Sequence, residues 1–161
     1  MTKYSLSFTS PINPPQAYPP LSHTQVWNGL MRKCRRPQDF LGVLADCHIL
    51  REDANGMKRI LLFKPGMGPP SNQATEVLTF HGQTTIDILL VEAGNLMTQT
   101  ISRGRGADEL YLTYTFTGEF LDIAEGTAHA LEKGRLLTSE LDQVVPETIE
   151  LIRAWVGIGE L

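Results

Sequence analysis

The stretch SPINPPQAYPPLSHTQVW, residues 10–27, ends one secondary-structure element and begins another, so it sets the layout of the whole chain. Its five prolines, at positions 11, 14, 15, 19 and 20, remove backbone donors and hold the chain extended, so neither a strand nor a helix continues through it. Ser22 and Gln25 then have the spacing of a capping box, which predicts a helix that begins near His23. The stretch is interpreted as a rigid connector between a strand and a helix.

The residues on either side of this connector agree with that interpretation. YSLSFTS, residues 4–10, alternates apolar and polar side chains as a half-buried strand does. From Val26 to Cys34 apolar residues recur at helical spacing, and the cations of RKCRRP favour a helix C-terminus before Pro37. A further helical turn is expected around residues 39–41. The chain therefore begins with a strand and two short helices.

The rest of the chain divides into strands and one long helix. From Val43 onward, six strand-like segments are separated by turn-forming runs such as DANG, PGMGPPSN, HGQ, AGN and RGRGADE. Such short connections leave little room for crossover helices, so an antiparallel meander is predicted. After Asp122 the pattern is helical, and Pro146 predicts a kink or a restart within it. The helix has a wide apolar stripe that includes Leu131, Leu136, Leu137, Leu141 and Val145.

This order of elements predicts an α+β fold in which a seven-stranded, curved antiparallel sheet surrounds a long C-terminal helix, with two short helices after the first strand. Such packing buries the concave face of the sheet against the helical stripe and leaves room for a cavity between them. At 161 residues, the chain is expected to form a single domain, residues 1–161.

Composition narrows the class of protein and its partners. The chain is 42% hydrophobic and 20% charged with a net charge of -4, which is typical of a globular protein and argues against a nucleic-acid partner. It has no run approaching the roughly 18 apolar residues of a membrane span and no apolar segment of signal-peptide length, so a cytoplasmic location is expected. Cys34 and Cys47 are expected to be free, buried thiols. No metal and no cofactor are predicted, because neither zinc-site nor nucleotide-loop spacings occur.

Several segments resemble those of one superfamily. SFTSPINPP, LSHTQVWNGLMRKCRRPQDF, LADCHIL, MKRILLFKPG and LYLTYTF are similar to segments of the START and birch-pollen-allergen superfamily, also called SRPBCC, helix-grip or polyketide cyclase-like, and of an uncharacterised fungal and bacterial subfamily within it. The resemblance covers essentially the whole chain. It implies a helix-grip fold with an internal hydrophobic cavity, in a superfamily of lipid carriers, hormone receptors, aromatase/cyclases and other cofactor-free enzymes. It carries over no catalytic motif.

These observations favour a START-like ligand-binding domain for a hydrophobic small molecule, polyketide-like or another secondary metabolite. Cofactor-free cyclisation, dehydration or isomerisation of that molecule is the candidate activity. One alternative is a non-catalytic carrier or sensor of a lipid or metabolite, whose cavity wall would be almost wholly apolar. Another is a partner-binding subunit with a filled core and an exposed apolar patch. Neither the ligand nor the oligomeric state follows from the residues.

Three residues are candidates for catalysis: Arg59, Tyr114 and Glu76. Arg59 shares a strand face with apolar residues, so it is either a cation that binds an anionic oxygen of a ligand or the partner of Glu76 or Asp87 in a structural ion pair. Tyr114 lies on an apolar face of its strand, where a phenol either donates to a substrate carbonyl or bonds to the backbone. Glu76 would supply charge or protons to such a reaction.

A further set of residues is predicted to line the ligand cavity. The set is Trp27, Phe63, Met67, Ile88, Gln99, Leu112, Leu137, Leu141 and Val145. Residues 64–73 form the longest interruption of the meander and are interpreted either as a gate at the cavity mouth or as a plain surface loop. His48 and His81 are weaker candidates for a general base, since each is readily explained as a structural or solvent-exposed histidine, as is His129.

Overall fold

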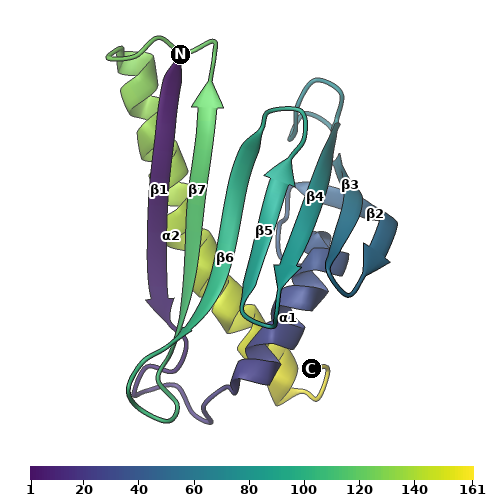
Figure 1. Ribbon diagram of the computed structural model, residues 1–161, viewed down its shortest axis with the longest axis vertical. Coiled ribbons are helices and arrows are strands. Elements are labelled where there is room, and N and C mark those ends of the chain that lie inside the picture. Colours follow the sequence, from purple (N-terminus) through teal and green to yellow (C-terminus); the bar gives the residue numbers. More distant parts are fainter.

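The computed structural model describes all residues, 1–161, and contains one seven-stranded antiparallel sheet and three helical segments (Figure 1). In chain order the elements are β1 (Thr2–Pro11), α1 (His23–Arg35), the 3-10 helix η1 (Pro37–Asp39), β2 (Leu44–Asp53), β3 (Gly56–Phe63), β4 (Gln73–His81), β5 (Thr85–Leu90), β6 (Asn95–Arg103), β7 (Leu110–Phe120) and α2 (Ala128–Gly157). The strand order is β1-β7-β6-β5-β4-β3-β2. The predicted fold class, with its meander and its long C-terminal helix, is confirmed.

The two ends of the proline-rich connector, residues 12–22, are joined by hydrogen bonds, and its last residue caps α1. The side chain of Asn13 donates to the carbonyl of Leu21 at 2.9 Å and accepts from the Leu21 amide at 2.7 Å. Ser22 then caps α1, because its hydroxyl accepts from the Gln25 amide at 3.1 Å while the Gln25 side chain accepts from the Ser22 amide at 2.9 Å. The predicted capping box is therefore present, and it fixes where α1 begins.

The terminal helix is less interrupted and less buried than its sequence predicts. α2 is one helix with Pro146 inside it, so the expected restart is wrong. Leu137, Leu141 and Val145 are buried, whereas Leu131 and Leu136 are 70% and 51% exposed. Figure 1 shows the first half of α2 lying along β1 and β7, whereas its second half also passes α1. The apolar stripe of α2 is therefore flanked by both the sheet and α1 only in that second half. None of the helices combines the length and apolar composition needed to cross a membrane.

The two ends of the sheet differ in what covers them. Residues 64–72, 91–94 and 121–127 connect elements at the upper end as drawn in Figure 1, and residues 82–84 and 104–109 connect strands at the lower end. α1 lies over the lower halves of the central strands, and no helix lies over the upper ends of β4 and β5. α1 and the second half of α2 thus cover the lower part of the concave face, and residues 64–72, which the sequence predicts to be a gate or a plain surface loop, lie at the upper end.

A tight contact between the two helices gives a first prediction. A Cβ at Gly29 of α1 would lie 2.6 Å from Cδ1 of Ile152 on α2 and would overlap the rest of that side chain. Because overpacking of a core costs about 1–3 kcal/mol, Gly29→Ala is expected to lower the free energy of unfolding by that amount, measured by urea denaturation. Gly42→Ala is the control, since a Cβ there meets nothing within 4 Å. Equal stabilities of the two variants would contradict this account of the contact.

The turn after α1 gives a second prediction, about pH. Asp39 of η1 accepts from Arg36 at 3.0 Å and from Arg32 at 3.2 Å, and the Arg36 guanidinium is the main group that lowers the pKa of the Asp39 carboxyl. A lowered pKa in the folded state stabilises the protein above the ordinary value, about pH 4, and this contribution is lost as the pH falls through the lowered pKa. Wild type should therefore exceed Asp39→Asn in unfolding free energy at pH 6, and the difference should shrink by pH 3. A difference of the same size at both pH values would contradict this assignment.

Candidate functional site

A polar cluster lies between the concave face of the sheet and α2, within an otherwise apolar interior. Nζ of Lys33 on α1 donates to the hydroxyl of Tyr114 on β7 and to the hydroxyl of Thr148 on α2, both at 3.0 Å. The Tyr114 hydroxyl is 3.4 Å from that of Thr148. Lys33 is 7% exposed and the other two residues are each 1% exposed. One ammonium and two hydroxyls thus converge at one point, each supplied by a different element.

The predicted candidate Arg59 lies beside this cluster, on the concave face of β3, and its donors are occupied by protein groups. Its Nε and Nη2 donate to Oε2 of Glu76 on β4, at 2.8 and 2.6 Å. Its Nη1 donates to the carbonyl of Lys33 at 3.2 Å and to that of Cys34. Arg59 therefore holds the last turn of α1 against the sheet. Asp87, the other ion-pair partner considered for it, instead contacts His81.

Glu76, the partner of Arg59, lies on β4 closer to the upper end of that strand than to its lower end. Its side chain is 15% exposed, and both Arg59 donors share its Oε2 atom, so its Oε1 atom accepts no hydrogen bond from the protein. Along the upper half of the concave face, apolar side chains are only partly buried. These are Phe63, Leu90, Met97 and Phe116. This half-exposed apolar surface lies next to the polar cluster, because Phe116 is two residues from Tyr114 on the same strand face and Met97 is paired with Phe116 in the sheet register.

Gln99 adds an unpartnered acceptor to the same region. It lies on β6 opposite Tyr114 of β7 in the sheet register, and it is 3% exposed. Its Oε1 atom is buried without a hydrogen-bond partner. Buried side-chain oxygens normally have a partner, so this one is a position at which a ligand hydroxyl would be stabilised.

The other residues predicted to line a cavity fall into two groups. Ile88, Leu112, Leu137, Leu141 and Val145 are buried, as is Trp27, whose ring packs edge-on against Phe80 with the centroids 6.3 Å apart. Phe63 is half-buried at the upper end of the concave face. Met67, by contrast, is 57% exposed in the connection 64–72 and lies outside the packed interior.

The three histidines considered as a general base are all exposed, whereas Cys34 is buried next to the cluster. His48 is exposed and lies 3.3 Å from Asp46, and His81 is exposed and lies 2.9 Å from Asp87. His129 is exposed near the start of α2. Cys34 is buried, and this burial raises the pKa of its thiol to about 11 against the opposing effect of Arg59 and Lys33. The Cys34 thiol is therefore kept in its protonated, poorly nucleophilic form.

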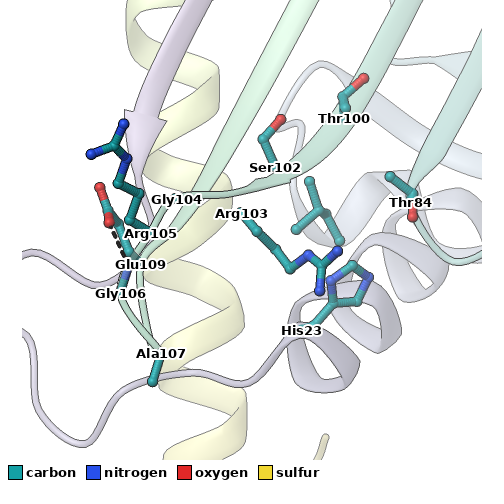
Figure 2. Close-up of a pocket in the computed structure, with 11 residues that line it drawn as sticks. His23, Thr84, Thr100, Ser102, Arg103, Gly104, Arg105, Gly106, Ala107 and Glu109 are labelled. Carbon is teal, nitrogen blue, oxygen red and sulfur yellow. Dashed lines mark hydrogen bonds between the residues drawn. The ribbon is translucent and has the colours of Figure 1, made fainter.

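The hollow in Figure 2 is a different place, at the lower end of the sheet. It has a volume of about 730 Å³ and is lined by His23, Thr84, Thr100, Ile101, Ser102, Arg103, Gly104, Arg105, Gly106, Ala107 and Glu109. Its lining is mostly exposed polar side chains and hairpin backbone, and no buried unpartnered polar atom belongs to it. A second hollow, of about 490 Å³, lies between Leu6 of β1 and exposed residues of α2. We place the candidate site at the polar cluster, because only there do buried polar groups converge.

Sequence reasoning missed Lys33 and Thr148. Lys33 was assigned to the cations that favour the C-terminus of α1, yet it follows Val26 and Leu30 at helical spacing and so falls on their buried face. That spacing could have identified it. Thr148 has no such signal, because a threonine near a proline in a helix is unremarkable; its hydroxyl donates to the carbonyl of Val144 at 2.7 Å.

The sheet curved against a long C-terminal helix, with a short helix after the first strand, is the helix-grip arrangement that the sequence predicts. A family model described as AtaL, acetylaranotin biosynthesis cluster protein L, matches residues 6–159, and the chain belongs to this family. A relative named acetylaranotin biosynthesis cluster protein L, from Aspergillus terreus, is 25% identical over 162 residues, which cover 98% of this chain and 93% of the relative.

Solved structures support the fold. The Zhui aromatase/cyclase from Streptomyces sp. R1128 superposes with a TM-score of 0.67 at 13% identity, covering 96% of each chain. The di-domain ARO/CYC StfQ from the steffimycin biosynthetic pathway superposes with a TM-score of 0.66 at 13% identity, covering 93% of this chain and 50% of that one. At this identity the likeness concerns the fold alone.

Proposed function

We propose that residues 1–161 act as one ligand-binding domain that takes a hydrophobic small molecule, polyketide-like or another secondary metabolite, over the concave face of the sheet and promotes its cofactor-free cyclisation, dehydration or isomerisation. The observation that carries the proposal is the convergence of the Lys33 ammonium with the Tyr114 and Thr148 hydroxyls, 3.0–3.4 Å apart in an apolar interior. An enzyme site needs several polar groups within reach of one point, whereas a carrier does not. The named origins of the relatives support the substrate class.

The groups have separable roles in such a reaction. Tyr114 would donate a proton to a carbonyl oxygen, or take one from an enol, and the adjacent Lys33 ammonium would stabilise the charge on that oxygen. Glu76 Oε1, which accepts no hydrogen bond, would take up a proton at the more exposed end of the site. Arg59 donates its hydrogen bonds to Glu76 and to the last turn of α1, which carries Lys33. It would therefore act as a positioning residue for Glu76 and Lys33. The half-exposed apolar surface would hold the substrate folded.

Native mass spectrometry of the protein purified from its own source tests whether it binds an apolar small molecule. A co-purifying apolar compound that wild type converts would support an enzyme. Retention of an unchanged compound would favour the alternative of a carrier or sensor. The absence of any apolar compound, together with self-association through the exposed Leu131 and Leu136, would favour the partner-binding subunit.

A further inference from the structure

One buried charge in the site has no counter-charge. Lys33 has no carboxylate among its contacts, and its hydrogen-bond partners are the two neutral hydroxyls of Tyr114 and Thr148. Of the three charged side chains in and beside the cluster, two are cations, Lys33 and Arg59, and one is a carboxylate, Glu76, which is paired with Arg59. The site therefore carries one positive charge in excess. Buried charges are costly unless paired, so an excess cation at this depth indicates a missing anion.

The neighbouring cations of α1 show that Lys33 is an exception. Arg32 pairs with Asp39 and Glu160, and Arg36 pairs with Asp39. Arg35 pairs with Glu52 at 2.6 Å. The side chains of Arg32, Arg35 and Arg36 are 24%, 50% and 61% exposed, so pairing matters less for them than for a buried charge, and each has a carboxylate partner. Lys33, the buried member of the same run, has none.

The donors of Lys33 are also incompletely used. An ammonium has three N–H groups, and two of them are directed at Tyr114 and Thr148. The third has no acceptor in the chain. The ring faces of Tyr114 and Phe40, with centroids 4.9 and 5.5 Å from Nζ, offset part of the cost of burial but accept no conventional hydrogen bond.

The surrounding groups restrict which anion fits. The Thr148 hydroxyl donates to the carbonyl of Val144, and the Tyr114 O–H donates to the Thr148 oxygen over a long distance of 3.4 Å. The donors for a ligand are therefore the third Lys33 N–H and the Tyr114 O–H, which would exchange that long hydrogen bond for one to the ligand. Two donors from one side suit a single anionic oxygen, whereas the second oxygen of a carboxylate would find no further donor. The unpartnered Gln99 Oε1 lies across the strand pair from Tyr114 and needs a donor rather than an acceptor.

We propose that the Lys33 ammonium is the binding group for an enolate or phenolate oxygen of the ligand, with Tyr114 as second donor and Gln99 accepting from a neighbouring ligand hydroxyl. This proposal rests on the proposed function, because it assumes a ligand on the concave face. It names the ligand as an acidic enol or phenol of an apolar ring system. It also assigns Lys33 a role in contact with the reacting oxygen, which Arg59 cannot fill while its donors are occupied.

Two matched probes test the proposal. 4-Nitro-1-naphthol has a coloured anion, and its methyl ether has the same ring system but cannot ionise. Absorbance spectra of the naphthol bound to the protein, recorded across a pH series, report how strongly the site favours the anion. Fluorescence quenching or equilibrium dialysis gives the affinity for the ether. We expect wild type to bind both probes and to shift the ionisation of the bound naphthol towards lower pH, equivalent to at least tenfold tighter binding of the anion.

The variants separate charge from packing. Lys33→Met keeps the length of the side chain without its charge, and Lys33→Gln serves as a second variant if the first repacks the interior. Both should bind the ether as wild type does and lose the ionisation shift. Lys58→Met is the control, because Lys58 is exposed on the same protein. Circular dichroism and urea unfolding verify that each variant is folded.

The outcomes distinguish the two proposals. If wild type binds both probes but the naphthol ionises as it does in water, Lys33 is not the anion-binding group, and the proposed function stands without it. The same conclusion follows if folded Lys33→Met and Lys33→Gln keep the shift. If wild type binds neither probe, ligand binding on the concave face fails and the role of Lys33 fails with it.

Discussion

Replacing Arg59 by alanine is expected to lower the free energy of unfolding by about 3–5 kcal/mol, as the removal of one partner from a buried ion pair typically does. Arg59 is 5% exposed, and the variant would leave Glu76 without its cation and the carbonyls of Lys33 and Cys34 without their donor. The last turn of α1 would lose its attachment to β3. Urea denaturation at neutral pH measures the loss.

Two comparison variants make this expectation specific. Arg35→Ala removes a pair of similar length, 2.6 Å to Glu52, but Arg35 is 50% exposed, so a loss of no more than about 1 kcal/mol is expected. The double variant Arg59→Met/Glu76→Leu removes both charges together and should recover much of the stability. If Arg59→Ala costs no more than Arg35→Ala, the ion pair is not the stabilising contact described above. Turnover by the folded double variant would remove both residues from the catalytic set.

The sheet and the terminal helix could be predicted because their signals are local. Each strand carries its own alternation and is bounded by its own turn residues, and the capping box at Ser22 marks where α1 begins. The facing of Arg59 and Tyr114 could also be predicted, since apolar neighbours two residues away fix the side of the strand that is buried. These inferences need no knowledge of distant parts of the chain.

The remaining features depend on contacts between distant residues. Lys33 meets Tyr114 and Thr148 across 81 and 115 positions, and a cation at a helix C-terminus already has a sufficient local explanation, so its burial went unpredicted. The apolar pattern of α2 likewise does not indicate which part of the helix is packed against the rest of the protein, and Leu131 lies in a part that is exposed. Pro146 predicts a kink or a restart, and α2 continues through Pro146 as one helix, so the restart does not occur.

The largest effect on activity is expected from Tyr114→Phe. The substitution keeps the aromatic ring in the core and removes the hydroxyl that Lys33 contacts at 3.0 Å. Loss of a general acid or base lowers turnover by about 100- to 10,000-fold, and we expect a loss in this range. The probe reaction is the interconversion of the enol and keto forms of 1-phenylbutane-1,3-dione, in which a proton leaves the enol oxygen and another joins C2. The ultraviolet absorbance of the enol follows its rate.

Tyr111→Phe is the matched control, because Tyr111 lies on the same strand but on its other face, where its hydroxyl contacts Glu109 at 2.6 Å. Since the roles proposed for Tyr114 are proton transfer and a second hydrogen bond to the ligand oxygen, Tyr114→Phe should lower kcat far more than it lowers the affinity for the diketone, and Tyr111→Phe should leave both unchanged. A fall in affinity with kcat unchanged would instead assign the Tyr114 hydroxyl to binding. Equal turnover by wild type and Tyr114→Phe would mean that the reacting groups lie elsewhere in the protein. No acceleration by wild type over water would favour the carrier, in which the polar cluster orients a bound compound without converting it.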